Sequence, residues 1–341
     1  MAEATPCTER TVSDSDDHNG IIYDDTSLYG VRMEQAVEEA DPIAGRRRVL
    51  LTVLVVAAVG IVGFVTLVSP AFDRSSKKTA SRSNGTADSG ASKGGFTGGD
   101  FHSLVADPAV ADRVFVGGHQ AVSVSSDGGS SWVEVGSLAD ADAMGWSFSG
   151  DAVWVSGHPG IVNSSDNMKT VEQRNGGLPD TDIHALGGSG NVLYAAGPRI
   201  GVLKSVDNGV VWTTATSSVG QSFFGRILVD PNDVNHIVAA DPLNGVLASN
   251  DAGVTWKQLT DTPASWVSSP DGLDTLYASG AQAATRSNDR GATWSPLALP
   301  ETATTVEADP TTPTRLYAGA HDGNRVRVWS SIDDGATWEA R

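Results

Sequence analysis

The chain has 341 residues, a formal net charge of -18, 38 glycines and one cysteine. Residues 96–341 carry 28 acidic and 13 basic side chains, and because so acidic a domain repels phosphate backbones, the charge argues against a nucleic-acid partner. The cysteine, Cys7, lies near the N-terminus. The C-terminal domain therefore has no disulfide and is held by its own core, which suits a bacterial envelope protein.

The first 48 residues combine 11 acidic and 5 basic side chains with little hydrophobic periodicity. Such a segment has too little apolar surface to offset chain entropy, so residues 1–48 are predicted to be a disordered tail. The next 20 residues, 49–68, contain no charge. At about 1.5 Å per residue they span a hydrocarbon layer of about 30 Å, which predicts a transmembrane helix. A cleaved signal peptide is the competing interpretation.

Basic residues flank this predicted span on both sides, with Arg46, Arg47 and Arg48 before it and four Lys or Arg within 74–82 after it. The count nearly balances. Because the arginines abut the span directly, we predict a single-pass protein of the cell membrane with a cytoplasmic N-terminus and an extracytoplasmic C-terminal domain. Residues 69–99 are mostly Ser, Gly, Lys and Thr, which predicts a flexible stalk.

One short pattern recurs six times within residues 100–341, as in Ser125-Ser-Asp127-Gly-Gly129-Ser-Ser131-Trp132. The Asp can accept backbone N–H groups of its own turn, the Gly can take a positive φ, and the Trp offers a large apolar face. The copy around residue 166 lacks the Gly and the Trp. The repeated aspartates, which we assign a structural role, are Asp127, Asp166, Asp207, Asp251, Asp289 and Asp333.

These aspartates are spaced by 38 to 44 residues, which is typical of a four-stranded blade. We therefore predict an all-β fold, a six-bladed β-propeller over residues 100–341 that is preceded by one transmembrane helix. The last repeat leads into a predicted outer strand at the C-terminus, and the first inner strand is predicted to begin near Asp100. The ring is thus predicted to close blade against blade, without a strand from the other end of the chain.

These repeats resemble the Asp-box (BNR) repeats of the sialidase-like superfamily, and they are similar to those of bacterial glycosyl hydrolase-like, sortilin-type and photosystem II assembly factor-type propellers. The resemblance covers residues 100–341. For a sialidase it would imply an arginine triad, a Tyr/Glu nucleophile pair and an acid/base Asp. However, the Arg-Ile-Pro signature is absent, and Tyr194, Tyr277 and Tyr317 share one repeated strand position, as core residues do. Sialidase activity is therefore not expected, and whether the chain is an enzyme stays open.

A general glycosidase needs only two carboxylates at a suitable separation. The candidates lie between the predicted blades on the face opposite the Asp-boxes, and they are Asp140, Asp142, Asp180, Asp182 and Glu301. In a domain with 28 acidic residues, the alternative is that each of these is a solvated loop residue.

Five histidines are predicted on that same face. They could bind a divalent metal or a ligand at the channel mouth, or they could hydrogen-bond neighbouring blades. Trp146 and Arg226 lie near this face and could form a platform for a sugar or peptide, or could pack in the core. No His-x-His spacing supports a preformed metal site, so no metal is assigned. The histidines are His102, His119, His158, His184 and His321.

Two functions stay open for this chain. The first is a ligand- or protein-binding module, held by its membrane anchor, for an envelope protein or glycan. The second is a glycoside hydrolase with a non-sialidase active site that acts on an envelope or extracellular glycan. Two carboxylates about 5 to 10 Å apart over an apolar floor would favour the hydrolase, whereas a His-lined rim without that pair would favour binding.

Overall fold

The computed structural model describes residues 94–158 and 160–341. These residues form 25 β-strands and one short 3-10 helix, η1 (Gly136–Leu138). Within these two ranges there is no helix with the length and apolar character that a membrane crossing requires. The predicted tail, the predicted transmembrane helix at 49–68 and the predicted stalk up to residue 93 lie outside the described residues.

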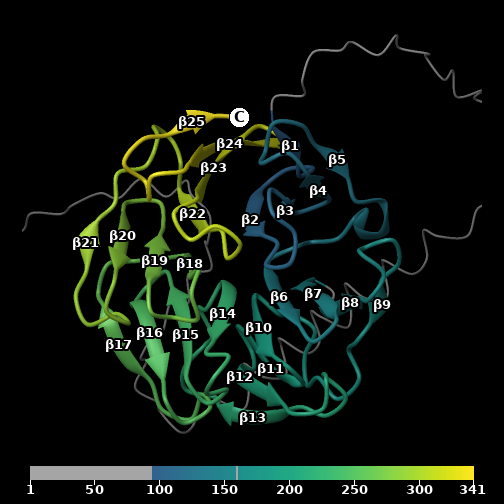
Figure 1. Ribbon diagram of the computed structural model, residues 1–341. Coiled ribbons are helices and arrows are strands. Elements are labelled where there is room, and N and C mark those ends of the chain that lie inside the picture. Colours follow the sequence, from purple (N-terminus) through teal and green to yellow (C-terminus); the bar gives the residue numbers. More distant parts are fainter. Residues whose placement is uncertain (1–93, 159) are drawn as a thin grey trace, which may run out of the picture. The chain divides into compact units, whose positions relative to one another are not determined.

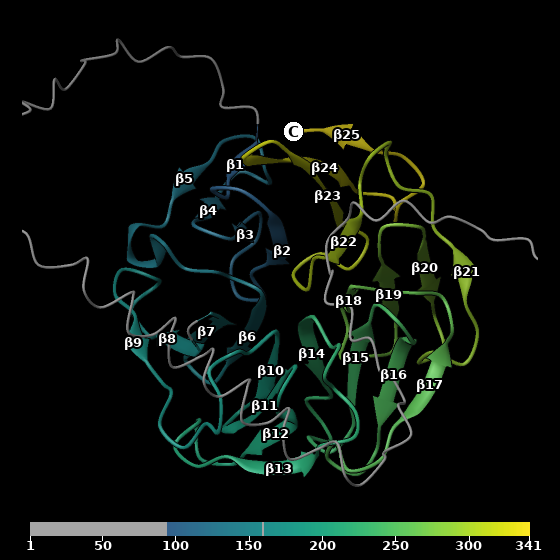
Figure 2. The ribbon, with the colours of Figure 1, turned by 180° about the vertical axis from the view of Figure 1, so that it is seen from behind.

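From β2 onward the strands form consecutive antiparallel groups of four, and Figure 1 shows these groups arranged in a ring. The inner strands, nearest the centre in Figures 1 and 2, are β2 (Phe101–Ala106), β6 (Gly145–Ser149), β10 (Ala185–Ser189), β14 (Gly225–Val229), β18 (Trp266–Ser268) and β22 (Thr305–Ala308). The second strands are β3 (Val114–Gly118), β7 (Ala152–Gly157), β11 (Val192–Gly197), β15 (Ile237–Asp241), β19 (Leu276–Ser279) and β23 (Leu316–Asp322).

The third strand of each group leads into the turn that carries the repeated Asp. These strands are β4 (Val122–Ser125), β8 (Gly160–Ser164), β12 (Gly201–Ser205), β16 (Gly245–Ser249), β20 (Ala284–Ser287) and β24 (Arg325–Ser331). The outer strands are β5 (Val133–Glu134), β9 (Glu172–Gln173), β13 (Thr213–Thr216), β17 (Lys257–Thr260), β21 (Ser295–Pro296) and β25 (Glu339–Ala340). The inner strands β10 and β14 pair in parallel, so the third and fourth groups form one eight-stranded sheet.

The last group is completed from both ends of the described chain. The outer strand β25 pairs with the C-terminal half of β24, at Trp329 and Ser330. The first strand, β1 (Gly95–Phe96), pairs with the N-terminal half of β24, at Val326 and Arg325. The prediction that the ring closes without a strand from the other end is therefore wrong. The strand pairing also begins at Gly95, inside the segment predicted to be stalk, because its two residues satisfy an edge that the short β25 leaves open.

The repeated aspartates each organise a turn of the same kind, which we call an Asp turn. In the turn of Asp251, the Ser249 hydroxyl donates to Oδ1 at 2.8 Å, and the backbone N–H of Thr255 donates to the same oxygen at 2.8 Å. The Thr255 hydroxyl donates to Oδ2 at 2.6 Å. These bonds lower the pKa of Asp251 to about 2, with the Thr255 hydroxyl the largest cause. The first two bonds recur at Asp127, Asp166, Asp207, Asp289 and Asp333.

A further turn of this kind lies between β18 and β19, where no repeat was recognised. Its Ser269 hydroxyl donates to Asp271 at 3.3 Å, and the N–H of Thr275 donates to the same carboxylate at 2.8 Å. Leu273 occupies the glycine position with φ 82°. The sequence pattern missed this turn because the search relied on the Gly and the Trp, whereas the Ser, Asp and Thr spacing is unchanged.

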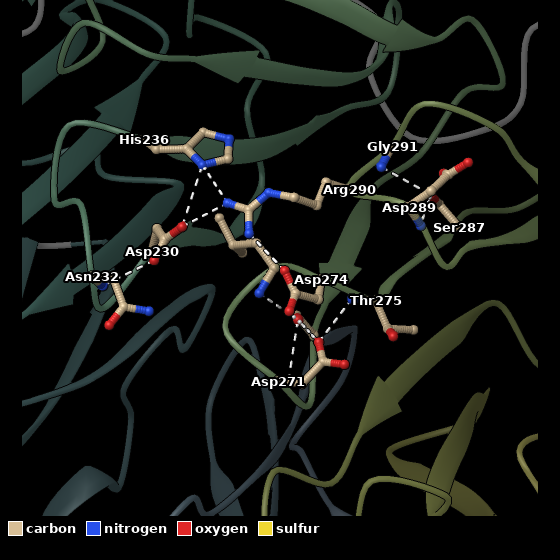
Figure 3. A network of polar contacts seen from close by, with 12 residues as sticks. Asp230, Asn232, His236, Asp271, Asp274, Thr275, Ser287, Asp289, Arg290 and Gly291 are labelled. Atoms are coloured by element: carbon tan, nitrogen blue, oxygen red, sulfur yellow. Dashed lines mark hydrogen bonds and ion pairs between the residues drawn. The ribbon is translucent and has the colours of Figure 1, made fainter.

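A polar network next to this turn joins the fourth and fifth groups (Figure 3). Arg290, which follows the Asp of the fifth Asp turn, donates to Asp230 at 2.6 Å and to Asp274 at 2.6 Å. It also contacts Nδ1 of His236 at 2.9 Å. One guanidinium thus ties the turn after β14 to the turn after β18, and His236 has a structural role on the Asp-turn side of the ring.

Side chains and backbone from four inner strands meet in the centre of the ring. Glu307 on β22 is 0 % exposed, and Arg226 on β14 donates to its carboxylate at 2.8 Å. The Trp266 indole on β18 donates at 3.0 Å, and the backbone N–H of Ala106 on β2 donates at 3.2 Å. Burial raises the pKa of Glu307, although Arg226 opposes that rise. This cluster fills the centre and ties the inner strands together.

Candidate functional site

Three consecutive groups place histidines and aspartates together on the side of the ring opposite the Asp turns. His102 lies in β2 and His119 in the turn after β3, both in the first group. The second group contributes Asp142 from the loop before β6 and His158 from the turn after β7, and the third contributes Asp182 and His184 just before β10. The name histidine face is used below for His102, His119, Asp142, His158, Asp182 and His184.

The aspartates of this face occupy equivalent positions in the three groups, and a glycine explains how each is seated. Asp142 begins the loop into β6, and a Cβ on Gly157 at the end of β7 would overlap its backbone carbonyl. The same relation holds between Gly197 and Asp182, and between Gly118 and Asp100. Only glycine permits such close approach of two backbones. The inner strands and the following turns are therefore drawn together, which brings each Asp near a residue that follows the glycine.

Asp142 is the buried centre of the cluster, with a side chain that is 5 % exposed. Its Oδ1 lies 2.9 Å from Nδ1 of His102, and its Oδ2 lies 2.8 Å from Nδ1 of His158. These are close ionic contacts, although neither oxygen has the alignment of a hydrogen bond with any described residue. Burial alone would raise the pKa of Asp142, but His102, His158 and His119 outweigh burial and lower it. The carboxylate is therefore ionised at neutral pH.

Asp182 receives two further histidine contacts. Its Oδ1 lies 2.5 Å from Nε2 of His158 and 2.8 Å from Nε2 of His184, and the two Nε2 atoms are 3.4 Å apart. Burial lowers the pKa of His184, against the raising effect of Asp182. His158 therefore stands between two carboxylates, with one ring nitrogen facing Asp142 and the other facing Asp182.

The rim around this pair is closed by charged and aromatic side chains that the sequence analysis did not place in the site. Arg199 donates to Asp180 at 2.5 Å and lies 3.5 Å from Asp182. Its guanidinium holds the pKa of Asp180 well below the usual range. Phe224 packs edge-on against His102 and His184, with ring centroids 5.9 and 6.1 Å away.

Two groups of three side chains on this side could hold a metal ion, since one ligand atom of each lies within 4.8 Å of the others. One is His158, Asp182 and His184. The other joins His102 and His119 to Asp100, whose carboxylate lies 4.0 Å from His102. Asp100 was not among the predicted candidates, and its signal was the Asp-x-His spacing that it shares with Asp182 and His184.

The remaining predicted site residues lie apart from this cluster. His321 bonds through Nε2 to the carbonyl of Gly99 at 2.9 Å, and no contact with the histidine face is found among the described residues. The carboxylates of Asp140 and Glu301 are solvent-facing, without a hydrogen bond or ion pair in the described part of the chain. They are solvated loop acids in this structure, the alternative that the sequence left open.

The predicted aromatic platform is not on the open face. Trp146 is 0 % exposed and its indole donates to the Ser103 hydroxyl at 2.8 Å, so it packs in the core. Arg226 is paired with buried Glu307, and its charge is neutralised inside the ring. Both residues therefore follow the core alternative.

No protein-family model matches this chain, and no curated protein matches its sequence. Solved structures do resemble it. The GH74 xyloglucanase from Xanthomonas campestris is 17% identical with a TM-score of 0.50, and the match covers 72% of this chain and 46% of that chain. The GH74 enzyme of Niastella koreensis is 16% identical with a TM-score of 0.52 over 72% of this chain and 45% of that chain. This chain thus spans less than half the length of either enzyme.

A chain of a nidogen/laminin complex is 12% identical with a TM-score of 0.53, and the match covers 66% of this chain and 92% of that chain. Likeness at such low identity shows the fold alone. Together with the ring of four-stranded antiparallel groups, it shows that residues 94–158 and 160–341 adopt a β-propeller fold.

Proposed function

We propose that this chain is a single-pass membrane protein whose six-bladed Asp-box propeller is an extracytoplasmic binding module for an envelope protein or glycan. The observation that carries the proposal is the histidine face. Equivalent positions of three successive groups converge there on two buried or half-buried carboxylates, Asp142 and Asp182. Polar side chains that converge from separate elements on one open rim are typical of a binding site.

The Asp-box assignment is supported by the recurrence of the same turn. The Ser–Asp bond and the bond from the backbone N–H four residues after the Asp are present in all six predicted repeats. Membrane anchoring rests on the uncharged segment 49–68, and the extracytoplasmic location of the propeller rests on the arginines next to it.

The state of the carboxylates favours binding over hydrolysis. A glycosidase needs one carboxyl that stays protonated near neutral pH to act as general acid. The pKa values of Asp142 and Asp180 are instead lowered, by histidines in the first case and by Arg199 in the second. Neither residue is therefore suited to donate a proton to a leaving group.

A glycoside hydrolase remains the second candidate, because Asp142 and Asp182 lie on opposite sides of the single imidazole ring of His158. Two carboxylates so placed are the minimum that such an enzyme requires. The similar fold of two GH74 enzymes is consistent with this candidate, and the nidogen/laminin complex is consistent with a propeller that binds protein.

Site-specific photo-crosslinking tests the binding role. A photoreactive phenylalanine analogue replaces His119 on the histidine face or Val254 in an Asp turn, two side chains that are equally exposed at 56 %. The full chain is produced in bacterial cells and irradiated. A discrete adduct from position 119 and none from position 254 is expected. Equal adducts from both positions, or none from either, would refute the binding role.

A panel of envelope and plant glycans separates the second candidate. The full chain is expected to release no sugar from any of them. Release of sugar that is lost in Asp182→Asn and retained in Glu301→Gln would overturn the binding proposal in favour of hydrolysis, because Glu301 is a solvated acid of the same loops.

The single cysteine allows a direct test of orientation. A membrane-impermeant maleimide should leave Cys7 unmodified in intact cells and modify it after lysis. In the Cys7→Ser background, Val254→Cys should be modified in intact cells, since this side chain is exposed. The reverse pattern would refute the proposed orientation, and modification of both cysteines in intact cells would refute the membrane span.

A further inference from the structure

We propose that His158, Asp182 and His184 are the three protein ligands of one zinc ion, and that Asp142 positions His158 for this role. The inference deepens the proposed function and rests on it, because it names the ligand class that the histidine face takes. Two imidazoles and one carboxylate are a ligand set that Zn²⁺ favours.

The spacing of the ligand atoms fits one small ion. Two ligands bound tetrahedrally to zinc at about 2.0 to 2.1 Å lie about 3.3 to 3.4 Å apart. The Nε2 atoms of His158 and His184 are 3.4 Å apart. Asp182 Oδ1 lies closer, at 2.5 and 2.8 Å from these nitrogens, so it need retreat by less than about 1 Å to join the same ion. Both histidines thus present the same ring nitrogen to one point.

Asp142 supplies the support that a metal-bound histidine usually has. A histidine that binds metal through Nε2 carries its proton on Nδ1 and commonly donates it to a carboxylate, which fixes the tautomer and the ring orientation. Asp142 Oδ2 lies 2.8 Å from Nδ1 of His158, the ring nitrogen that does not face Asp182. Neither Asp142 oxygen is satisfied by another aligned donor among the described residues. Its buried carboxylate is therefore explained by an acceptor role toward an oriented imidazole.

The charge of the site also calls for a cation. Asp180 is neutralised by Arg199, which leaves Asp142 and Asp182 as two carboxylates among neutral imidazoles. A divalent ion balances these two charges, and it does so in a partly desolvated pocket where Phe224 covers His184. The alternative is a doubly protonated His158 that bridges the two carboxylates as a single cation.

Three protein ligands leave one tetrahedral position for an external donor. That position is on the solvent side, because the side chain of His158 is 49 % exposed while Asp142 behind it is buried. A carboxylate, imidazole or thiolate from the bound partner can occupy it. The group of Asp100, His102 and His119 is wider and more exposed, and no ion is assigned to it.

Isothermal titration with ZnCl₂ tests the inference. The full chain is solubilised in detergent, stripped with chelator and titrated near pH 7.5, in a Cys7→Ser/His18→Ala background that removes tail ligands. One saturable equivalent is expected, and Co²⁺ should give the visible absorption of tetrahedral coordination. His184→Ala and Asp182→Asn should abolish both signals, and Asp142→Asn should weaken zinc binding by about 10- to 100-fold.

The matched control is His321→Ala, on the same side but bonded to Gly99, and it should bind zinc like the parent. Thermal unfolding without metal shows that each variant is folded. Absence of saturable binding, or unchanged affinity in both His184→Ala and Asp182→Asn, would overturn the zinc site and leave His158 as the bridging cation. If the adduct from position 119 persists when zinc does not bind, only the metal inference fails. If zinc binds but no adduct forms, the partner-binding role fails instead.

Discussion

Replacement of Arg226 by Met would leave the Glu307 carboxylate charged and buried in the centre of the ring. Breaking a buried ion pair costs about 3 to 5 kcal/mol. The Trp266 indole and the Ala106 N–H still donate to this carboxylate, at 3.0 and 3.2 Å, so we expect the lower end, a loss of about 3 kcal/mol in the free energy of unfolding at pH 7. For a unit of this size, that corresponds to a fall in Tm of about 6 to 12 °C.

The pH dependence of this loss follows from the raised pKa of Glu307. A carboxyl whose pKa is raised by folding stabilises the fold while it is protonated, and this stability is lost as pH rises through the folded pKa. Without Arg226 to oppose the rise, the deficit of Arg226→Met relative to the parent should grow as pH rises from 5 to 8. The double variant Arg226→Met/Glu307→Gln should recover most of it, since no charge then remains buried.

The assay is urea unfolding of the detergent-solubilised full chain, followed by tryptophan fluorescence at pH 5 and pH 8 and extrapolated linearly to zero urea. A single variant within about 1 kcal/mol of the parent at pH 8 would refute a structural role for the pair. A deficit that is the same at both pH values would refute the assignment to the Glu307 charge.

Four further changes test the turns and the ring closure by the Tm of the same protein. Ala252, with φ 62°, sits where glycine is favoured, so Ala252→Gly should stabilise by about 0.5 to 1 kcal/mol. Gly291, with φ 85° and Leu259 beside its Cα, should be destabilised by Gly291→Ala by about 1 to 2 kcal/mol, and effects of equal sign would contradict the turn geometry. The pKa of Asp251 is lowered to about 2, so its stabilisation is present above pH 4 and lost as pH falls to 2. The Tm gap between the parent and Asp251→Asn should therefore close over that range, and a constant gap would count against it. Gly95→Val should crowd the first strand and cost about 1 to 3 kcal/mol, whereas a silent change would mean that Gly95 is part of a free stalk.

The repeated Asp-x-Gly pattern predicted strands and turns at the right places because each Asp turn is held by bonds within a few residues. Its hydrogen bonds run from the Asp to residues no more than four positions away, so they are visible as a spacing. The turn at Asp271 escaped recognition because Leu273 replaces the glycine in the same backbone conformation. The strand β1 escaped because its partner in β24 lies more than 200 residues away, and two residues such as Gly95 and Phe96 carry no periodicity.

The sequence alone also marked the histidines and most of the aspartates of the site, because polar residues at strand ends belong to one side of a repeat architecture. It could not show which of them meet. His158 reaches Asp142 of its own group and Asp182 of the next, while His321, at the same strand position in the last group, bonds only to a backbone carbonyl.

The amino-acid sequence by itself therefore determined the repeats, their turns and the side of the ring on which to look, since these depend on local bonds and period. Only the tertiary structure decided that Trp146 and Arg226 are core residues, and that Asp142 is the buried centre of a histidine cluster. The physical reason is that these roles depend on how neighbouring groups pack. That packing is set by close backbone contacts, such as the one between Gly157 and Asp142, which join residues of separate strands.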